Sequence, residues 1–260
     1  MDNFILRYFN AIRTFIALAI GIILSIVLIY IISTTPLESL RAFLLGPVMS
    51  KGRIANVLEM ASPIILCGIA IAVSFQAEQF NIGAEGALYI SAAVGTAFAV
   101  STNLPAIFHV PLVLIVAGAT GGIWGGIPGY LKAKWNASEV VSSLMLNYVA
   151  YYLGLYLINY HFRDKEAGFL VSYRLPESAW FHQFVQGTRI HWGIAFSVAM
   201  ALLIYYFLYH TTTGYEIRST GFNQKFARFG GINIFKVIIL AQVFTGMLAG
   251  LGGMSEVMGI

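Results

Sequence analysis

The stretch Thr14–Ile32 reads TFIALAIGIILSIVLIYII and contains no charged side chain. A helix needs about 20 apolar residues to cross a bilayer, and this run supplies nearly all of them. The run follows Arg7 and Arg13, it is longer than a signal-peptide core, and no small-residue cleavage site comes after it. We therefore expect an uncleaved membrane-spanning helix here.

The composition places the whole chain in the same class. Of its 260 residues 58% are hydrophobic and only 10% are charged, whereas soluble domains are about 25% charged. The net charge of +4 comes from short clusters between apolar runs, which indicates a lipid bilayer as the neighbour and not a nucleic acid. Cys67 is the only cysteine, which excludes an intramolecular disulfide and a cysteine-rich metal site. We expect no metal and no cofactor.

Seven apolar runs approach the length that a membrane-spanning helix requires. They are residues 14–32, 57–75, 84–102, 110–131, 139–160, 193–210 and 237–258. We predict an all-α fold, a polytopic transmembrane helical bundle that forms a single domain over residues 1–260. The last run reaches almost to Ile260 without a polar tail, so we expect this domain to be incomplete and truncated at its C-terminus.

The distribution of lysine and arginine sets the expected orientation. With the N-terminus in the cytoplasm, eight basic residues lie inside and seven outside. The inner set is Arg7, Arg13, Lys132, Lys134, Arg218, Lys225, Arg228 and Lys236, and the outer set is Arg41, Lys51, Arg53, Arg163, Lys165, Arg174 and Arg189. Four of the outer residues fall in one long loop, residues 161–192, and short segments carry more weight in this rule. We favour a cytoplasmic N-terminus, which makes the 161–192 loop extracytoplasmic.

Two series of glycines at four-residue spacing mark the fourth run. Their members are Gly118, Gly122 and Gly126, and Gly121, Gly125 and Gly129. Small residues at this spacing let a neighbouring helix approach to backbone contact. We therefore expect this helix to pack inside the bundle. Gly246 and Gly250 mark the last run in the same way.

The stretch Gln76–Gly86, QAEQFNIGAEG, separates two apolar runs without any lysine or arginine and is referred to below as the broken segment. Its polar residues include Asn81 and Glu85, and a carboxylate at membrane depth must face a cavity or a partner. Non-helical backbone survives there only beside water or buried in protein. One interpretation is a broken helix that lines a translocation path, and the other is an interfacial loop with solvated carboxylates. Asn147, inside the fifth run, is either an interhelical clamp or a ligand.

The stretch Gly214–Asn233, GYEIRSTGFNQKFARFGGIN, is a polar and basic insert between two apolar runs. Asn223 can cap a short helix over residues 224–229, and Gly230 and Gly231 can end it. At helical pitch three aromatic residues, Phe222, Phe226 and Phe229, share one face. The basic residues of this stretch point elsewhere. Such a helix either docks into a groove of a partner protein or lies on the inner lipid surface.

Sequence motifs of common enzymes are absent. The chain has no GxxxxGK[ST] for ATP, no HExxH and no GxSxG. Its two aspartates, Asp2 and Asp164, lie outside the apolar runs, which excludes an intramembrane aspartyl-protease pair. We therefore expect that the chain is not an enzyme and has no ATPase site of its own. If it moves a solute uphill, the energy must come from a partner or an ion gradient.

Four stretches in order resemble the membrane-spanning permease subunits of bacterial ABC importers for simple sugars, nucleosides and branched-chain amino acids. FNIGAEG, at residues 80–86, looks like the segment of the nucleoside branch. GYLKAKWNASEVVSSLMLNYVA, at residues 129–150, is similar to the family pattern LKA…NEV…MLNY, although Ala137 and Ser138 precede the glutamate. The polar insert and the terminal GMLAGLGGMSEVMG also resemble family motifs, and in the insert Ser219 and Phe226 replace the usual alanines. The resemblance covers most of the chain.

The resemblance implies a role for each of these segments. Residues 211–236 would be a cytoplasmic coupling segment that contacts an ATP-hydrolysing subunit, which favours the docking helix over the lipid-surface helix. The coupling residues would be Glu216, Arg218, Gly221, Phe222, Asn223, Phe226, Arg228, Phe229 and Gly231. Asn81, Glu85 and Asn147 would line the substrate path.

The same resemblance implies partners and a location. We expect cytoplasmic ABC ATPase subunits, a second permease subunit that is identical or related, and an extracytoplasmic substrate-binding protein. The expected place is the bacterial plasma membrane, and the expected cargo is a nucleoside or a related simple sugar. Family members usually have further spans after the last motif.

Two rival functions explain part of the pattern. An ion-coupled secondary transporter with a broken helix explains residues 76–86 equally well, but it does not explain the basic insert and it works without any ATPase. A membrane scaffold without a transport path predicts that Glu85→Gln changes stability alone.

Overall fold

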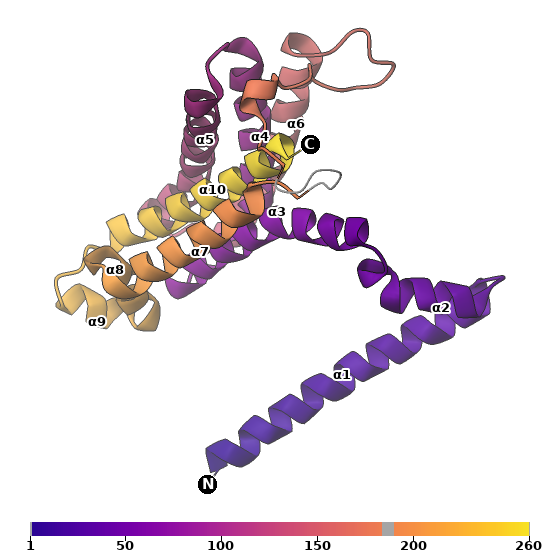
Figure 1. Ribbon diagram of the computed structural model, residues 1–260. Helices are drawn as coiled ribbons and strands as arrows, with labels where there is room; N and C mark the ends of the chain where they lie inside the picture. The colour runs from indigo at the N-terminus through magenta and orange to yellow at the C-terminus, as the bar shows by residue number, and fades with distance from the viewer. Residues whose placement is uncertain (1, 184–189, 260) are drawn as a thin grey trace. The chain divides into compact units, whose positions relative to one another are not determined.

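The computed structural model describes residues 2–183 and 190–259, so Arg189 and Ile260 lie outside the described residues (Figure 1). Regular structure in the described part is helical, and seven of its helices are long and apolar enough to cross a membrane. This confirms the predicted all-α polytopic bundle. The elements are α1 (Asp2–Ile32), α2 (Pro36–Leu45), η1 (Gly46–Val48), α3 (Lys51–Gln76), α4 (Ala84–Ser101), α5 (Ala106–Trp135), α6 (Glu139–His161), η2 (Glu177–Ala179), α7 (Gly193–His210), α8 (Thr212–Phe222), α9 (Gln224–Phe229) and α10 (Ile234–Met258).

Each predicted span corresponds to one long helix, and several helices extend beyond their apolar run. α5, for example, begins before residue 110 and continues to Trp135, which adds Lys132 and Lys134 to its last turn. Basic side chains are favourable at a helix C-terminus and can reach the membrane surface from there. The apolar run therefore marks the part of the helix within lipid and not its ends.

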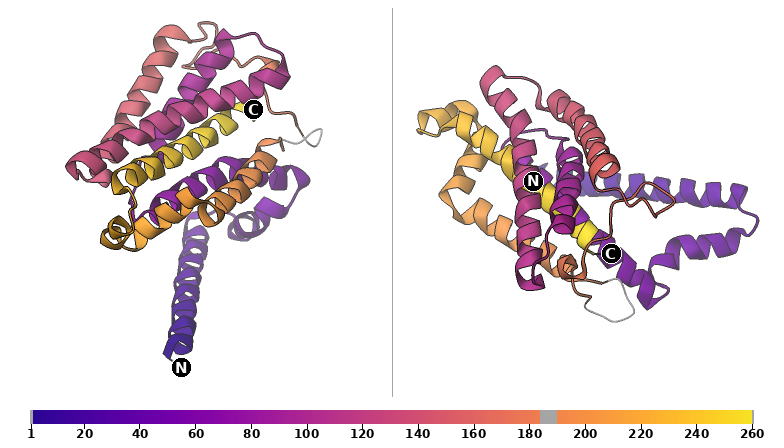
Figure 2. Two further views of the ribbon diagram at one scale, coloured as in Figure 1. Left: turned by 90° about the vertical axis from the view of Figure 1, so that its left-hand side faces the viewer. Right: turned by 90° about the horizontal axis from the view of Figure 1, so that it is seen from above.

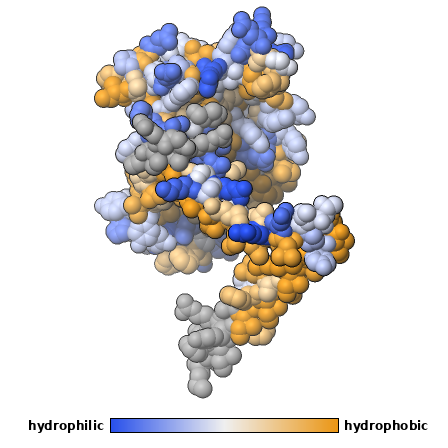
Figure 3. All heavy atoms as spheres, turned by 45° about the vertical axis from the view of Figure 1, so that its right-hand side comes forward, coloured by the Kyte–Doolittle hydropathy of each residue, from blue (hydrophilic) through white to orange (hydrophobic). Residues whose placement is uncertain are grey.

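The chain forms two compact units, residues 1–57 and 58–260. The first contains α1, α2, η1 and the start of α3. In α1 the most apolar 18-residue stretch has no buried residue, and its hydrophobic side chains are visible in Figure 3. α2 begins with Pro36 in its first turn, where the missing N–H of proline costs nothing.

The second unit is organised around α10, which packs against α5 and α4 (Figures 1 and 2). One buried cluster joins α3, α4, α7, α8 and α10 and includes Val73, Ile217 and Leu248. A second cluster joins α4, α5, η2 and the end of α10 and includes Val113 and Met258. α10 thus contributes to the core at both ends of the bundle.

The two glycine series on α5 both face α10, but at different distances. A Cβ added at Gly121 would lie 2.2 Å from the carbonyl oxygen of Gly246, so the two backbones are in direct contact there. A Cβ added at Gly118 would lie 3.4 Å from Cγ of Met247, an ordinary contact. Gly125 and Gly129 follow Gly121 along the same line of close approach. Direct backbone contact explains why side chains are missing at these positions.

Interactions within the second unit place its connections at two opposite ends. At one end α8 touches the end of α3, and a salt bridge of 2.9 Å joins Lys132 of α5 to Glu139 of α6. At the other end the N–H of Phe181 donates to the carbonyl of Met258, 2.9 Å away. The segments 76–84, 135–139 and 211–233 therefore share one end, and residues 162–183 lie at the other.

Candidate functional site

The short helix predicted in the polar insert is present as α9, with the predicted bounds. The side chain of Asn223 caps it by accepting a hydrogen bond from the N–H of Phe226, at 3.0 Å. Gly230 follows the last helical residue, and Gly231 has φ +84°, a left-handed conformation that suits glycine. Local residue chemistry thus fixes both ends of α9.

One face of α9, together with the residue that precedes its cap, is strongly apolar and exposed. Phe222, Phe226 and Phe229 are 87%, 71% and 92% exposed, and they are named below the phenylalanine ridge. Ala227, on the opposite side of α9, is buried and anchors the helix to the protein. Lys225 and Arg228 are also exposed, so the ridge has basic neighbours. Three exposed phenylalanines beside positive charges fit an amphipathic docking surface.

The polar insert contains a second helix, α8, which the sequence did not predict. Its two glycines, together with three threonines, make it a poor helix by intrinsic propensity. Tertiary packing compensates, because Ile217 is fully buried in the first core cluster. Arg218 donates from Nε to the carbonyl of Leu208, at 3.0 Å, and Glu216 is partly buried. α8 is therefore part of the bundle and not a mobile loop.

α8 also contacts the broken segment. A Cβ added at Gly221 would lie 2.1 Å from the carbonyl oxygen of Gln76 and 3.2 Å from the nitrogen of Glu78. Only glycine lets α8 come this close to the end of α3. The predicted coupling segment thus meets the broken segment at one contact, although Gly221 and Gln76 are 145 residues apart in the sequence.

The broken segment interrupts the helical backbone between α3 and α4. Glu78 has φ +55°, a left-handed conformation that is unusual for a residue other than glycine and that ends α3. Side chains of α6 then supply the hydrogen-bond partners that a continuous helix would have given to the backbone here. Oδ1 of Asn147 accepts from the N–H of Gly86 at 2.9 Å, and its Nδ2 donates to the carbonyl of Ile82 at 3.1 Å. Asn147 therefore acts as a clamp on the backbone of this segment.

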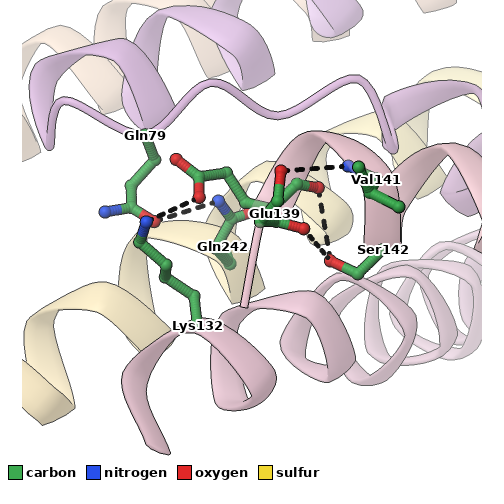
Figure 4. A network of polar contacts seen from close by, with 7 residues as sticks. Gln79, Lys132, Glu139, Val141, Ser142 and Gln242 are labelled. Carbon is green, nitrogen blue, oxygen red and sulfur yellow. Dashed lines mark hydrogen bonds and ion pairs between the residues drawn. The ribbon is translucent and has the colours of Figure 1, made fainter. Parts of the chain in front are cut away.

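Buried amide side chains hold the segment to α10. Asn81 is buried and donates from Nδ2 to Oε1 of Gln242. Nε2 of Gln242 in turn donates to Oε1 of Gln79, at 3.5 Å. Figure 4 shows Gln79 and Gln242 beside the Lys132–Glu139 ion pair, so polar groups from the broken segment, α5, α6 and α10 converge here.

The position of these contacts along the helices gives the depth of the segment. Asn147 and Gln242 each lie eight residues after the start of their helix, which corresponds to about 12 Å at 1.5 Å per residue. Asn81 is therefore packed inside the bundle, about two helical turns from the starts of α6 and α10. Glu78 and Glu85 are exposed in this chain, in contrast to Asn81.

Glu85 faces a groove between α4 and α6. A cavity of about 290 Å³ is lined by Glu85 and Asn147 together with aromatic residues of both helices, Tyr89, Tyr148, Tyr151 and Tyr152. The structure thus brings Asn147 and Glu85 to one cavity, and Asn81 lines a neighbouring one on the α3 side. The tyrosines and Gln242 did not feature in the sequence prediction. The α6 tyrosines had one available signal, their four-residue spacing, whereas Tyr89 and Gln242 had none.

The segment after α6 is anchored around His191. This residue is buried, stacks on Phe181 with 5.7 Å between ring centroids, and accepts at Nδ1 from the N–H of Gly193 at 3.0 Å. Burial lowers the pKa of His191 below its usual range, since the charged imidazolium would lose its hydration. His191 thereby fixes the start of α7 in its neutral form.

Comparison with known proteins gives one family and several relatives. Residues 53–260 match the family described as branched-chain amino acid transport system / permease component. The guanosine ABC transporter permease protein NupP of Bacillus subtilis is 35% identical over 79% of this chain and 60% of its own length. The glucose ABC transporter permease protein TsgB13 of Haloferax volcanii is 32% identical over 94% of this chain and 66% of its own.

A further relative, the nucleoside ABC transporter permease protein NupB of Lactococcus lactis subsp. cremoris, is 26% identical over 92% of this chain and 68% of its own length. This chain therefore spans about 60% to 68% of the length of these three relatives. No solved structure matches the chain significantly.

Proposed function

Since this chain belongs to the family of branched-chain amino acid transport system permease components, we propose that it is a membrane-spanning subunit of an ABC importer that moves nucleosides inward. The observation that carries the proposal is the similarity to relatives named as guanosine, nucleoside and glucose permeases. Two of these three names specify nucleosides, and the FNIGAEG stretch points to the same branch. Related simple sugars are the second choice.

The proposed partners are those that the family resemblance implies. A chain without an ATP-binding motif needs separate ATPase subunits, and the phenylalanine ridge on α9 offers them an apolar docking surface. A second permease subunit, identical or related, completes the path across the membrane. A substrate-binding protein delivers the cargo to the extracytoplasmic 161–192 loop. Residues 211–236 then lie in the cytoplasm with the N-terminus, and the complex resides in the plasma membrane.

The contact between α8 and the broken segment gives a route for coupling. ATP binding and hydrolysis in the partner would move α9, and α8 would pass that movement on at Gly221 to Gln76. The broken segment is held by side-chain hydrogen bonds in place of a continuous helical ladder, so it can shift without unwinding a whole helix. Alternation between inward-open and outward-open states then requires only that the two states differ in these contacts.

An ion-coupled carrier with a broken helix remains distinguishable from an importer by experiment. The full-length permease is reconstituted in vesicles with its ATPase and binding protein, and uptake of radiolabelled guanosine and glucose is measured with and without ATP. We expect ATP-dependent uptake of guanosine, with glucose at most a weak competitor. Uptake that needs an ion gradient and proceeds without ATP would overturn the proposal.

A further inference from the structure

α6 carries five tyrosines that are exposed along most of its length. They are Tyr148, Tyr151, Tyr152, Tyr156 and Tyr160. The members at four-residue spacing fall on one slowly turning face of the helix. From Tyr148 to Tyr160 this face extends about 18 Å along the helix axis. These five residues are named below the tyrosine ladder.

Contact with lipid does not explain the tyrosine ladder. Tyrosine concentrates at the two membrane surfaces, where its hydroxyl group reaches water. A ladder of about 18 Å covers more than half of the roughly 30 Å hydrocarbon core, so some of its hydroxyl groups lie between the surfaces. α7 provides the contrast, because Tyr205, Tyr206 and Tyr209 all lie within two turns of its end at His210. The α7 tyrosines fit a surface belt, whereas the α6 tyrosines require another polar neighbour.

Three members of the ladder line a groove that leads away from the broken segment, whereas Tyr156 and Tyr160 lie outside the lining of its two cavities. Tyr148, Tyr151 and Tyr152 border the cavity of about 290 Å³ that contains Glu85. A second cavity of about 370 Å³ shares Tyr89 and Tyr151 with the first and extends to Ser172, in the segment after α6. Because the cavities share walls, they form one groove from the broken segment towards the proposed outer loop. Tyr89 and Tyr151 contact each other edge to face where the two cavities adjoin, with 5.8 Å between ring centroids, so a base passes only when these rings move apart.

The side chains of the groove favour one class of ligand. Tyrosine rings stack on flat aromatic groups, and a nucleobase offers such a face whatever its substituents. Glu85 is an exposed carboxylate that accepts hydrogen bonds from hydroxyl groups and repels an anionic ligand such as a phosphorylated sugar. The first cavity is close to the lower limit of about 300 Å³ for small-molecule sites. A neutral molecule with a flat base and a hydroxylated sugar satisfies both requirements.

We propose that the groove between α4 and α6 is the track along which a nucleoside crosses this subunit. The base stacks on Tyr148, Tyr151 and Tyr152 at the inner end of the groove, where Glu85 accepts hydrogen bonds from the sugar hydroxyl groups. This inference rests on the proposed function and adds the residues and the class of cargo that they recognise. Stacking on a tyrosine ring depends little on which base is stacked, so the groove carries purine and pyrimidine nucleosides alike.

Thiol labelling tests the track independently of transport. Cys67 is the only cysteine in residues 1–260, so Cys67→Ser leaves this part of the chain free of thiols. Tyr152→Cys is introduced into the full-length permease in that background and treated in nanodiscs with a charged, membrane-impermeant thiol reagent. We expect labelling, and we expect saturating guanosine to slow it severalfold, because a bound nucleoside covers the thiol at position 152.

Matched variants keep the test decisive. Tyr206→Cys on α7 is the control, because Tyr206 is 62% exposed and Tyr152 is 66% exposed; guanosine should leave its labelling unchanged. Tyr148→Cys, one turn earlier on α6 and in the lining of the same cavity, replaces Tyr152→Cys if the latter does not fold. Tyr152→Phe, which keeps the ring, should retain guanosine uptake in the full complex, and Tyr152→Leu should raise the KM about fivefold or more.

Three results would overturn the track. The first is a thiol at position 152 that does not react, which would mean that lipid or another helix covers the ladder. The second is labelling that guanosine does not slow although the wild-type complex imports it, and the third is protection by glucose alone. Absence of ATP-driven uptake in the wild-type complex would instead refute the proposed function, while guanosine protection at position 152 would still report on the groove.

Discussion

The contact between α5 and α10 predicts opposite results for two glycines of one helix. At Gly121 an added Cβ would lie 2.2 Å from the carbonyl oxygen of Gly246 and 2.9 Å from Oγ of Ser91. Ordinary contact distances return only if the helices separate by roughly 1 Å, which forfeits about a quarter to a half of the dispersion energy of the contacts involved. Overpacking of this kind costs about 1–3 kcal/mol, and we expect Gly121→Ala to fall at the upper end.

The control is Gly118→Ala, on the same face of α5. Its Cβ would meet Cγ of Met247 at 3.4 Å, so no movement is needed, and alanine gains about 1 kcal/mol of helix propensity over glycine in soluble hosts. The assay is the free energy of unfolding in mixed detergent and SDS, followed by far-UV circular dichroism. Gly118→Ala should be neutral or slightly stabilising. Equal effects of the two substitutions would refute the claim that backbone contact at Gly121 and Gly246 holds the bundle together.

Three further predictions follow from single contacts. Asn147→Leu removes the partners of the Gly86 N–H and the Ile82 carbonyl and should cost about 2–4 kcal/mol in the same assay, and a cost near zero would show that water replaces the clamp. Asn223→Ala should cost about 1 kcal/mol at the α9 cap and speed amide exchange in residues 224–229 about fivefold, whereas exchange at the wild-type rate would mean that Ala227 holds the helix without the cap. Because the pKa of His191 is lowered in the folded state, the unfolded chain binds the proton first, so the free energy of unfolding should fall as the pH drops below about 6.5. His191→Gln should flatten that dependence. An unchanged pH profile in the variant would count against burial of a neutral imidazole.

Features that depend on local chemistry could be predicted from the sequence. The seven spans could be predicted because a helix in lipid must be apolar over its length. α9 could be predicted because Asn223, Gly230 and Gly231 specify its ends. α8 was not visible, since its residues favour helix only weakly and the burial of Ile217 stabilises it through contacts distant in the sequence.

The partners of the broken segment could not be predicted either. Gln242 is a single polar residue within an apolar run, and Ser143 is one of two adjacent serines in another; no spacing links either residue to residues 76–86. Only the fold shows that Oγ of Ser143 accepts from the N–H of Ile82, at 3.3 Å, or that Gln242 receives a hydrogen bond from Asn81. The tyrosine ladder did have a signal in its spacing, but burial and cavities were needed to separate it from an interfacial belt.

The central claim, that α9 transmits the energy of a partner ATPase to the broken segment, is tested most directly by one charge on the phenylalanine ridge. Phe226→Asp is compared with Gln224→Asp in the reconstituted complex. Residue 224 lies on the opposite side of α9, so Gln224→Asp adds the same charge away from the ridge. Both variants should insert into the membrane. We expect Phe226→Asp to lose cargo-stimulated ATP hydrolysis together with uptake, and Gln224→Asp to keep both. Wild-type stimulation of ATP hydrolysis in Phe226→Asp would contradict the account.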